Sequence, residues 1–244
     1  NSDGTLDVSG AATITGTAGQ ITAAFEDSTI TEASDVALTV DSSGTASLTQ
    51  ARTLDGLTTG VVTATIAATD LSDLVGSSPL LDANGNNAFT ITIGTDDASV
   101  SAADLNTLDG LTTVAINAGN VTTITSSSLA DINTLYASSG FSGLGDQDIT
   151  ASDDGSIAAS TISAIATANS DGTLDVSGAA TITGTAAEII AALSDSTVTD
   201  AADVALTVNS GTVTLAQAID LNALTTGVVT ATIADTAVSD LLHP

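Results

Sequence analysis

The chain has 244 residues and a formal net charge of −28, with 29 Asp and Glu residues against a single Arg. The lack of basic residues excludes nucleic-acid binding and adhesion to an anionic membrane surface, because both need cations that neutralise phosphates. No Cys is present for a disulfide or thiolate metal site, and no run of about 18 apolar residues could span a bilayer.

In chain order, short strands with alternating residues are separated by apolar pairs at helical spacing. Strict alternation places Val, Ile, Leu or Phe on one strand face and Thr on the other. Strands are predicted at 36–40, 62–66, 89–93, 205–208 and 229–233. Single helical turns are predicted around the pairs Ile21–Phe25, Leu71–Leu74, Leu105–Leu108, Ile132–Leu135, Ile189–Leu193, Leu221–Leu224 and Val238–Leu241. Capping boxes are predicted at Thr17/Gln20, Ser101/Asp104, Ser128/Asp131 and Thr185/Glu188.

The sequence also repeats over a long period. Residues 1–18 recur without change at 169–186, and residues 60–67 return at 227–234 after the loss of one residue near 41–44. We therefore expect residues 1–168 to be one full long repeat and residues 169–244 to be the start of a second copy, continuous with the first. The pattern is typical of a segment from a longer repetitive protein.

These elements predict an all-β fold with short helical turns, a parallel β-solenoid of about nine irregular coils. One coil cannot bury its apolar face alone, whereas stacked coils share a continuous core. A chain of small α/β or β-sandwich domains is the alternative fold.

Several segments resemble the repeat regions of giant secreted cell-surface proteins of marine cyanobacteria, a group described as haemolysin-like or β-strand repeat proteins. The resemblance lies in DLNTLDGLTT at 104–113, in residues 125–150 and in TITGTAAEIIAAL at 181–193. It implies an extracellular, cell-surface protein with a structural or adhesive role. The glycine-rich calcium nonapeptide of haemolysin-type repeats is absent from this chain.

The sequence offers little for catalysis, and we expect no enzymatic activity. The only His is His243, in a terminal segment that departs from the repeat, and Ile219 stands at the repeat position that corresponds to Arg52. The adjacent carboxylates Asp96-Asp97 and Asp153-Asp154 could form the acid pair of a glycosidase only beside an apolar pocket. Tyr136 and Phe141 are interpreted as a local core plug.

Calcium is the one cofactor that the residues favour, because short carboxylates with Asn and Gly in loops suit oxygen-ligand sites. Asp82, Asn84 and Asn86 have the alternating spacing that begins a calcium loop, although Ile93 occupies the position of its bidentate Glu. A second candidate set is Asp3 and Asp7, which recur as Asp171 and Asp175. The alternative for each loop is a plain turn, since Asp, Asn and Gly are turn residues.

The predicted function is structural: an extracellular surface layer, filament or adhesin stalk, in which open strand edges add the next repeat or another copy of the chain. Ice binding through the Thr-x-Thr triplets, such as 13–15, 63–65 and 181–183, is the first alternative. A calcium-dependent adhesin or a module that binds a surface glycan is the second. Partners would be copies of the chain, without nucleic acid or membrane insertion.

Overall fold

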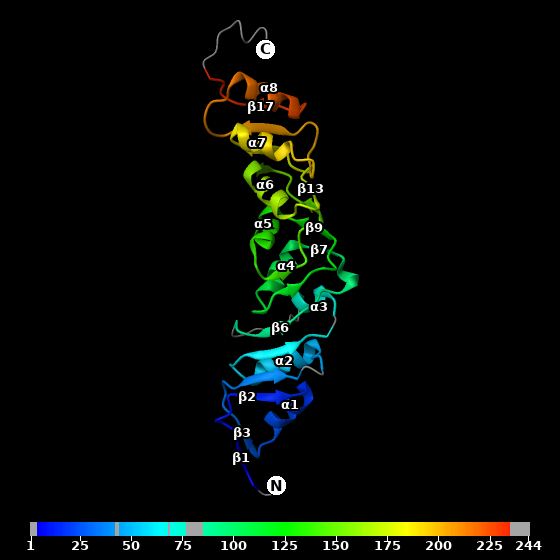
Figure 1. Cartoon of the computed structure of the whole chain (residues 1–244), viewed down its shortest axis with the longest axis vertical. Coiled ribbons are helices and arrows are strands. Elements are labelled where there is room, and N and C mark those ends of the chain that lie inside the picture. The colour runs from blue at the N-terminus through cyan, green and yellow to red at the C-terminus, as the bar shows by residue number, and fades with distance from the viewer. Residues whose placement is uncertain (1–3, 42–43, 68, 77–84, 235–244) are drawn as a thin grey trace. The chain divides into compact units, whose positions relative to one another are not determined.

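Short parallel strands alternate with helices along the described part of the chain (Figure 1). The computed structural model describes residues 4–41, 44–67, 69–76 and 85–234. The chain divides into unit 1, which is Asn1–Ala98, Asp104–Val121 and Ser138–Gly143, and unit 2, which is Ser99–Ala103, Thr122–Ala137 and Leu144–Pro244. The junction of the two sequence copies at residues 168 and 169 therefore lies inside unit 2.

All strand pairs are parallel, and each sheet lies within one unit. Unit 1 contains the sheets β2-β4-β5-β6, β1-β3 and β8-β10, and unit 2 contains β7-β9-β11-β13-β15 and β12-β14-β16-β17. The strands are β1 Leu6–Asp7, β2 Thr13–Gly16, β3 Ile30–Thr31, β4 Ala37–Val40, β5 Val62–Thr65, β6 Ala88–Thr90, β7 Ser99–Val100, β8 Ile116–Asn117, β9 Thr123–Ser127, β10 Phe141–Ser142, β11 Asp148–Ala151, β12 Ser156–Ala158, β13 Thr173–Asp175, β14 Thr181–Gly184, β15 Val198–Thr199, β16 Ala205–Val208 and β17 Val229–Thr230.

Eight α-helices lie between these strands in the described residues. They are α1 Ala18–Glu26, α2 Leu48–Leu57, α3 Leu71–Val75, α4 Ala102–Asp109, α5 Leu129–Ala137, α6 Ala159–Ala168, α7 Ala186–Leu193 and α8 Leu215–Leu224, with a short 3-10 helix at Thr95–Asp97. None of the helices in the described ranges is both long and apolar enough to cross a membrane.

The prediction of an all-β fold, a parallel β-solenoid of about nine irregular coils, is wrong, because the structure is mixed α/β, with parallel sheets interleaved with helices. The apolar pairs had indicated single helical turns, whereas the helices that contain three of these pairs, α1, α7 and α8, have 9, 8 and 10 residues. Ala, Gln and Leu extend the turns into helices, since these residues have high helix propensity. A pattern based on large apolar residues does not show this extension, because the added positions include small Ala side chains.

Capping boxes begin the four helices of the repeated blocks. Thr17 and Thr185 form the predicted boxes at the starts of α1 and α7. Ser47 with Gln50 and Thr214 with Gln217 form two further boxes, at the starts of α2 and α8. At α5, the Ser128 hydroxyl accepts the Asp131 N–H at 3.1 Å. Each box satisfies backbone N–H groups that the first helical turn leaves without partners.

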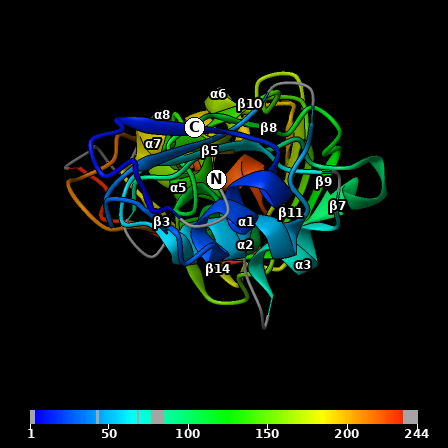
Figure 2. The same cartoon turned by 90° about the horizontal axis from the view of Figure 1, so that it is seen from below.

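The structure repeats a strand–strand–helix segment, which we call a rung. Unit 1 contains the rungs 6–26 and 30–57, and unit 2 contains the rungs 148–168, 173–193 and 198–224. Successive rungs pair strand to strand in register, for example Ile157 with Ile182 and Ile182 with Leu206. Their helices also pack together, α1 on α2 in unit 1 (Figure 2) and α6 on α7 on α8 in unit 2.

A Thr-Thr-Gly corner at the end of α2 joins the segment that follows the helix to the rung 30–57, which the helix closes. The Thr58 hydroxyl donates to Val36 O at 2.6 Å and accepts the Gly60 N–H at 2.9 Å. A Cβ on Gly60 would meet the backbone oxygen of Asp35, so the corner requires glycine at this position. The second copy repeats the corner, with Thr225 donating to Val204 O at 2.6 Å.

Candidate functional site

The predicted calcium loop around residue 84 is described only at its end. Asp82 and Asn84 lie outside the described residues, as does Asp3 of the second candidate set. Asn86 uses its side-chain amide nitrogen to donate to Thr59 O, in the Thr-Thr-Gly corner, at 3.2 Å. The structure thus places Asn86 in a contact between neighbouring segments of unit 1.

Asp7 and Asp175 occupy equivalent turns. The Asp7 carboxylate accepts the backbone N–H of Ser9 at 2.9 Å and its hydroxyl at 2.6 Å, and Asp175 accepts the Ser177 N–H at 2.9 Å. The hydrogen bonds from the hydroxyl and N–H of Ser9 lower the pKa of Asp7, because they favour its ionised form. This is the geometry of the plain turn that the sequence left as the alternative. Asp171 is exposed, four residues before Asp175.

The described carboxylates do not converge on a shared centre. No three His, Cys, Asp or Glu side chains in residues 4–41, 44–67, 69–76 and 85–234 form a group that could hold a metal ion. Asp7, Asp171 and Asp175 are therefore not brought into one such group, and calcium binding stays a prediction.

The adjacent acidic pairs have a structural use that the sequence did not reveal. Asp97 accepts the N–H of Leu71, the first residue of α3, at 2.8 Å, and Asp153 accepts the N–H of Leu129, the first residue of α5, at 2.7 Å. Ser127 does the same for Ala102 of α4 at 2.7 Å. Each of these side chains lies about one rung later in the chain than the helix that it caps. The caps therefore connect neighbouring segments of the chain.

A buried polar cluster lies beside the junction of the two copies in unit 2. The Tyr136 hydroxyl lies 2.9 Å from Gln147 Oε1 and 3.0 Å from Asn169 Oδ1, and Asn169 Nδ2 donates to Gln147 O at 2.8 Å. Burial, together with the charge of Asp146, raises the pKa of Tyr136, because both disfavour the phenolate. Tyr136 is thus a partly buried member of this polar cluster, held in its neutral form.

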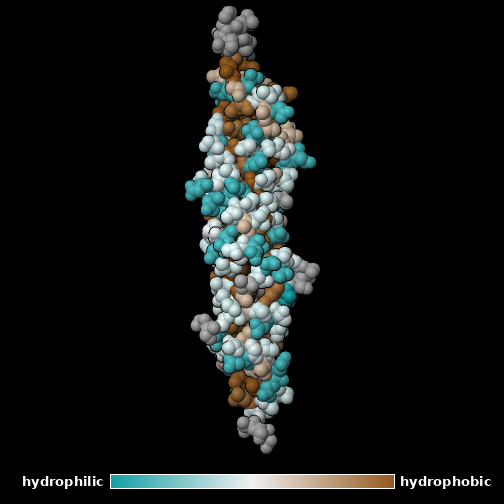
Figure 3. Space-filling model, turned by 90° about the vertical axis from the view of Figure 1, so that its right-hand side faces the viewer, coloured by the Kyte–Doolittle hydropathy of each residue, from teal (hydrophilic) through white to brown (hydrophobic). Residues whose placement is uncertain are grey.

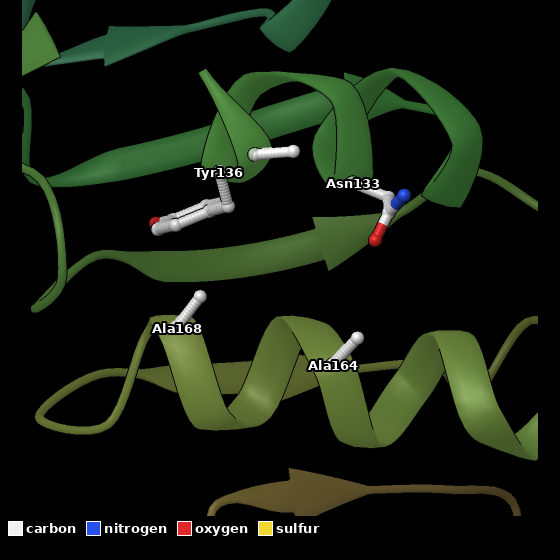
Figure 4. A pocket seen from close by; sticks show the side chains of 5 residues that line it. Asn133, Tyr136, Ala164 and Ala168 are labelled. Carbon is white, nitrogen blue, oxygen red and sulfur yellow. The ribbon is translucent and has the colours of Figure 1, made fainter. Parts of the chain in front are cut away.

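A shallow cleft of about 220 Å³ lies next to this cluster. Ala164 and Ala168 point from α6 toward α5, which supplies Asn133, Tyr136 and Ala137 (Figure 4). The small Ala side chains leave space between the two helices. The cleft has no charged lining residue, and the Tyr136 hydroxyl is directed toward Gln147 and Asn169. This chemistry offers neither an acid–base pair nor a cation site.

The identical 18-residue blocks lie in different surroundings. Leu6 in β1 is 57% exposed, whereas Leu174, the same residue in the second copy, is 1% exposed. Ile14 is partly exposed and its equivalent Ile182 is fully buried. Hydrophobic side chains are visible beside the grey N-terminal residues at the lower end of Figure 3. We call the surface formed by β1, β2 and α1 the leading face.

The second copy shows the opposite contrast at its far end. Ile66 is 6% exposed, whereas its equivalent Ile233 is 43% exposed, and Val228 is 70% exposed. In the first copy the following strand β6 pairs with β5, while β17 has no further strand partner among the described residues. We call the surface formed by β17 and α8 the trailing face. Each face carries apolar side chains and a strand edge that is open among the described residues, the features of an addition site.

Threonines line up across the strands in both units. Thr15, Thr39 and Thr63 are in register across β2, β4 and β5, and unit 2 repeats the column with Thr183, Thr207 and Thr230. Beside this column Thr13 is opposite Ala37, so the Thr-x-Thr triplets do not form two complete columns.

The repeat places an acidic residue with a buried carboxylate oxygen at two equivalent positions, Glu32 and Asp200. Each has one side-chain oxygen that is buried and makes no hydrogen bond. Burial raises the pKa of Asp200, because it disfavours the carboxylate. Neither this feature nor the buried pair of Gln147 and Asn169 was found from the sequence, since long-range packing creates both.

No known protein family, curated protein or solved structure matches this chain.

Proposed function

We propose that the chain is a structural repeat protein of an extracellular surface layer, filament or adhesin stalk. Its rungs form a continuous element in each unit, and its leading and trailing faces add the next repeat or another copy of the chain. A contact between two different surfaces leaves one face free on every added molecule, so repeated addition produces chains of molecules, which stay open where the rotation between copies does not close them into a ring.

The observation that carries this proposal is the contrast between the identical blocks. The second copy buries Leu174 under a neighbouring rung, while the first copy leaves Leu6 exposed with one open strand edge among the described residues. Burying a Leu side chain stabilises an interface by about 1.5–3 kcal/mol, and new strand pairing adds backbone hydrogen bonds. Addition at this end therefore has both a driving force and a defined register.

The charge of the chain sets the conditions for assembly. With a net charge of −28, two copies repel one another at low ionic strength. Salt shortens the range of this repulsion to about 8 Å at 0.15 M. Assembly is therefore expected to strengthen with salt, and calcium would add bridging between carboxylates of neighbouring copies.

Electron microscopy of the purified chain tests the proposal. Samples in low salt, in high salt, in calcium and in calcium followed by chelator should show end-to-end filaments or sheets that increase with ionic strength. Loss of the assemblies with chelator would assign the bridging to calcium. Single particles with the mass of one chain at every protein concentration would contradict assembly of copies.

The Thr columns favour ice binding as the second candidate function. Thr15 and Thr63 are exposed in the column of unit 1, and stacked hydroxyls on a β-surface can order water. Faceted ice crystals and thermal hysteresis in the presence of the protein would favour this function. A matched Thr39→Val variant should then reduce the hysteresis, and hexagonal growth identical to that of buffer would exclude it.

A further inference from the structure

The rung 148–168 covers the block 169–186 in unit 2, and it shows what the leading face is built to receive. β11 pairs with β13, which places Ile149 opposite Leu174. β12 pairs with β14, which places Ile157 opposite Ile182, and α6 packs on α7. The side chains that are exposed or partly exposed at Leu6 and Ile14 are the ones that this rung buries in the second copy.

Polar contacts fix the register of that rung. The Thr173 hydroxyl donates to Asp148 Oδ1 at 2.8 Å, and the Thr183 hydroxyl donates to Ile157 O at 3.1 Å. The sequence identity places Thr5 and Thr15 at the same positions of the leading face. The donors that recognise the rung are therefore present in the first copy.

A glycine of the block also fits this rung. An added Cβ on Gly178 would lie 3.1 Å from Asp153 O, while one on Gly10, its equivalent in the first copy, would have no atom within 4 Å. The leading face thus keeps the small residue that close approach of the chain requires, although the first copy has nothing against it in this structure.

We propose that the leading face is a docking site for a rung with the sequence of residues 148–168, supplied by another repeat of the same kind. The inference rests on the proposed end-to-end addition and names its partner. The docked rung would pair its Ile149 and Ile157 equivalents with Leu6 and Ile14 and would lay its helix on α1. The helix contact differs in part, because Gly19, Gln20 and Thr22 replace Ala187, Glu188 and Ile190, so the strands carry the recognition.

An extended chain tests this inference directly. Residues 143–168 are added in front of the full chain, so that Ala168 precedes Asn1 as it precedes Asn169 in the natural sequence. Hydrogen exchange then compares fragments that run through Gln20 with fragments that run through Glu188, because these residues distinguish the two copies. The amides of 6–16 should become about tenfold or more better protected, close to the protection of 174–184.

Three matched variants of the extended chain decide the result. In one variant, Asp replaces the copies of Ile149 and Ile157 in the added segment, and in another Leu6→Asp changes the leading face. Each of these variants should abolish the added protection. Val228→Asp alters an apolar residue of the trailing face that is 70% exposed, more than Leu6, and should leave the added protection unchanged. Protection that is absent in the extended chain, or that is the same with and without the Asp residues, would overturn the inference.

The outcome separates this inference from the proposed function. If the unextended chain forms filaments while the extended chain gains no protection, copies assemble and only the named partner is wrong. If the extended chain gains protection while the unextended chain remains a single particle, the docking site is correct and assembly of copies is wrong.

Discussion

The two copies of the repeated block share 18 identical residues and differ in what lies against them. Leu174 lies in β13, which pairs with β11 on one side and with β15 on the other. Leu6 lies in β1, which pairs only with β3. At the other end the order is reversed, since Ile66 is buried and Ile233 is partly exposed. The comparison teaches that burial here is a property of the neighbouring rung, because the local sequence is the same.

The same lesson holds for polar residues. Asp55 is buried and its carboxylate accepts a hydrogen bond of 2.6 Å from Asn87 Nδ2, while its equivalent Asn222 is exposed. A carboxylate can be kept in a buried position only with such a partner. Each copy therefore depends on residues outside the repeated block to complete its core.

The largest effect is expected from removing the same side chain in each copy. Leu174→Ala should lower the free energy of unfolding of its transition by about 2–5 kcal/mol, because it opens a cavity in the core. Leu6→Ala should change it by no more than about 0.5 kcal/mol, because Leu6 is largely exposed. Urea unfolding of dilute protein measures both, and equal losses would contradict the comparison.

The polar cluster at the junction is the next most sensitive place. Asn169→Ala removes the side-chain contacts of Asn169 with Tyr136 and Gln147, so about 1–3 kcal/mol of stability should be lost from unit 2. Tyr136→Phe removes only the hydroxyl and should cost less than Asn169→Ala. Thermal unfolding followed by circular dichroism ranks the two variants, and the reverse order would show that the cluster is not held by Asn169.

The Thr-Thr-Gly corner sharpens the comparison because both copies contain it in the same geometry. Thr58→Val and Thr225→Val each remove a hydroxyl that donates a 2.6 Å hydrogen bond to a backbone oxygen. Each variant should lose about 1 kcal/mol of stability, and the losses of the two variants should be nearly equal. Chemical unfolding measures the pair, and a large loss in one copy alone would mean that the corner depends on its outer neighbours.

The smallest effect concerns pH. The hydroxyl and N–H of Thr29 lower the pKa of Asp27, and the N–H and hydroxyl of Thr197 lower the pKa of Asp195, its equivalent. Their stabilisation is complete above the pKa of a free Asp, about 3.9, and is lost as pH falls through the folded pKa. Burial shifts Asp200 the other way, so its penalty is relieved as pH falls. Carboxyl-carbon NMR titration should give low midpoints for Asp27 and Asp195 and a raised one for Asp200. A midpoint at or above that of free Asp for Asp27 or Asp195 would contradict the turn geometry.

Much of the local structure could be predicted from the sequence. Residues 37–40 and 62–65 form strands within the predicted ranges, and the pairs Ile21–Phe25 and Ile189–Leu193 lie on helices. Alternation and helical spacing are set by near neighbours in the chain, so a single sequence contains them. The fold class was wrong because the lengths of the helices depend on Ala-rich segments without a strong apolar pattern.

The long-range contacts could not be predicted in the same way. Asp97 and Asp153 cap helices that precede them by about one rung, and Asn169 meets Tyr136 across the junction of the copies. Nothing in a local pattern states which segments become neighbours. The repeat itself was the one long-range signal, and it indicated equivalent positions without showing that the first block would be open on one side.

Hydrogen exchange of the unmodified chain at two protein concentrations tests end-to-end assembly most directly. In dilute protein the amides of 13–16 should exchange much faster than those of 181–184, although the residues are identical. At high concentration and high salt the difference should shrink as another copy covers the leading face. A difference that stays the same at every concentration would contradict assembly through this face.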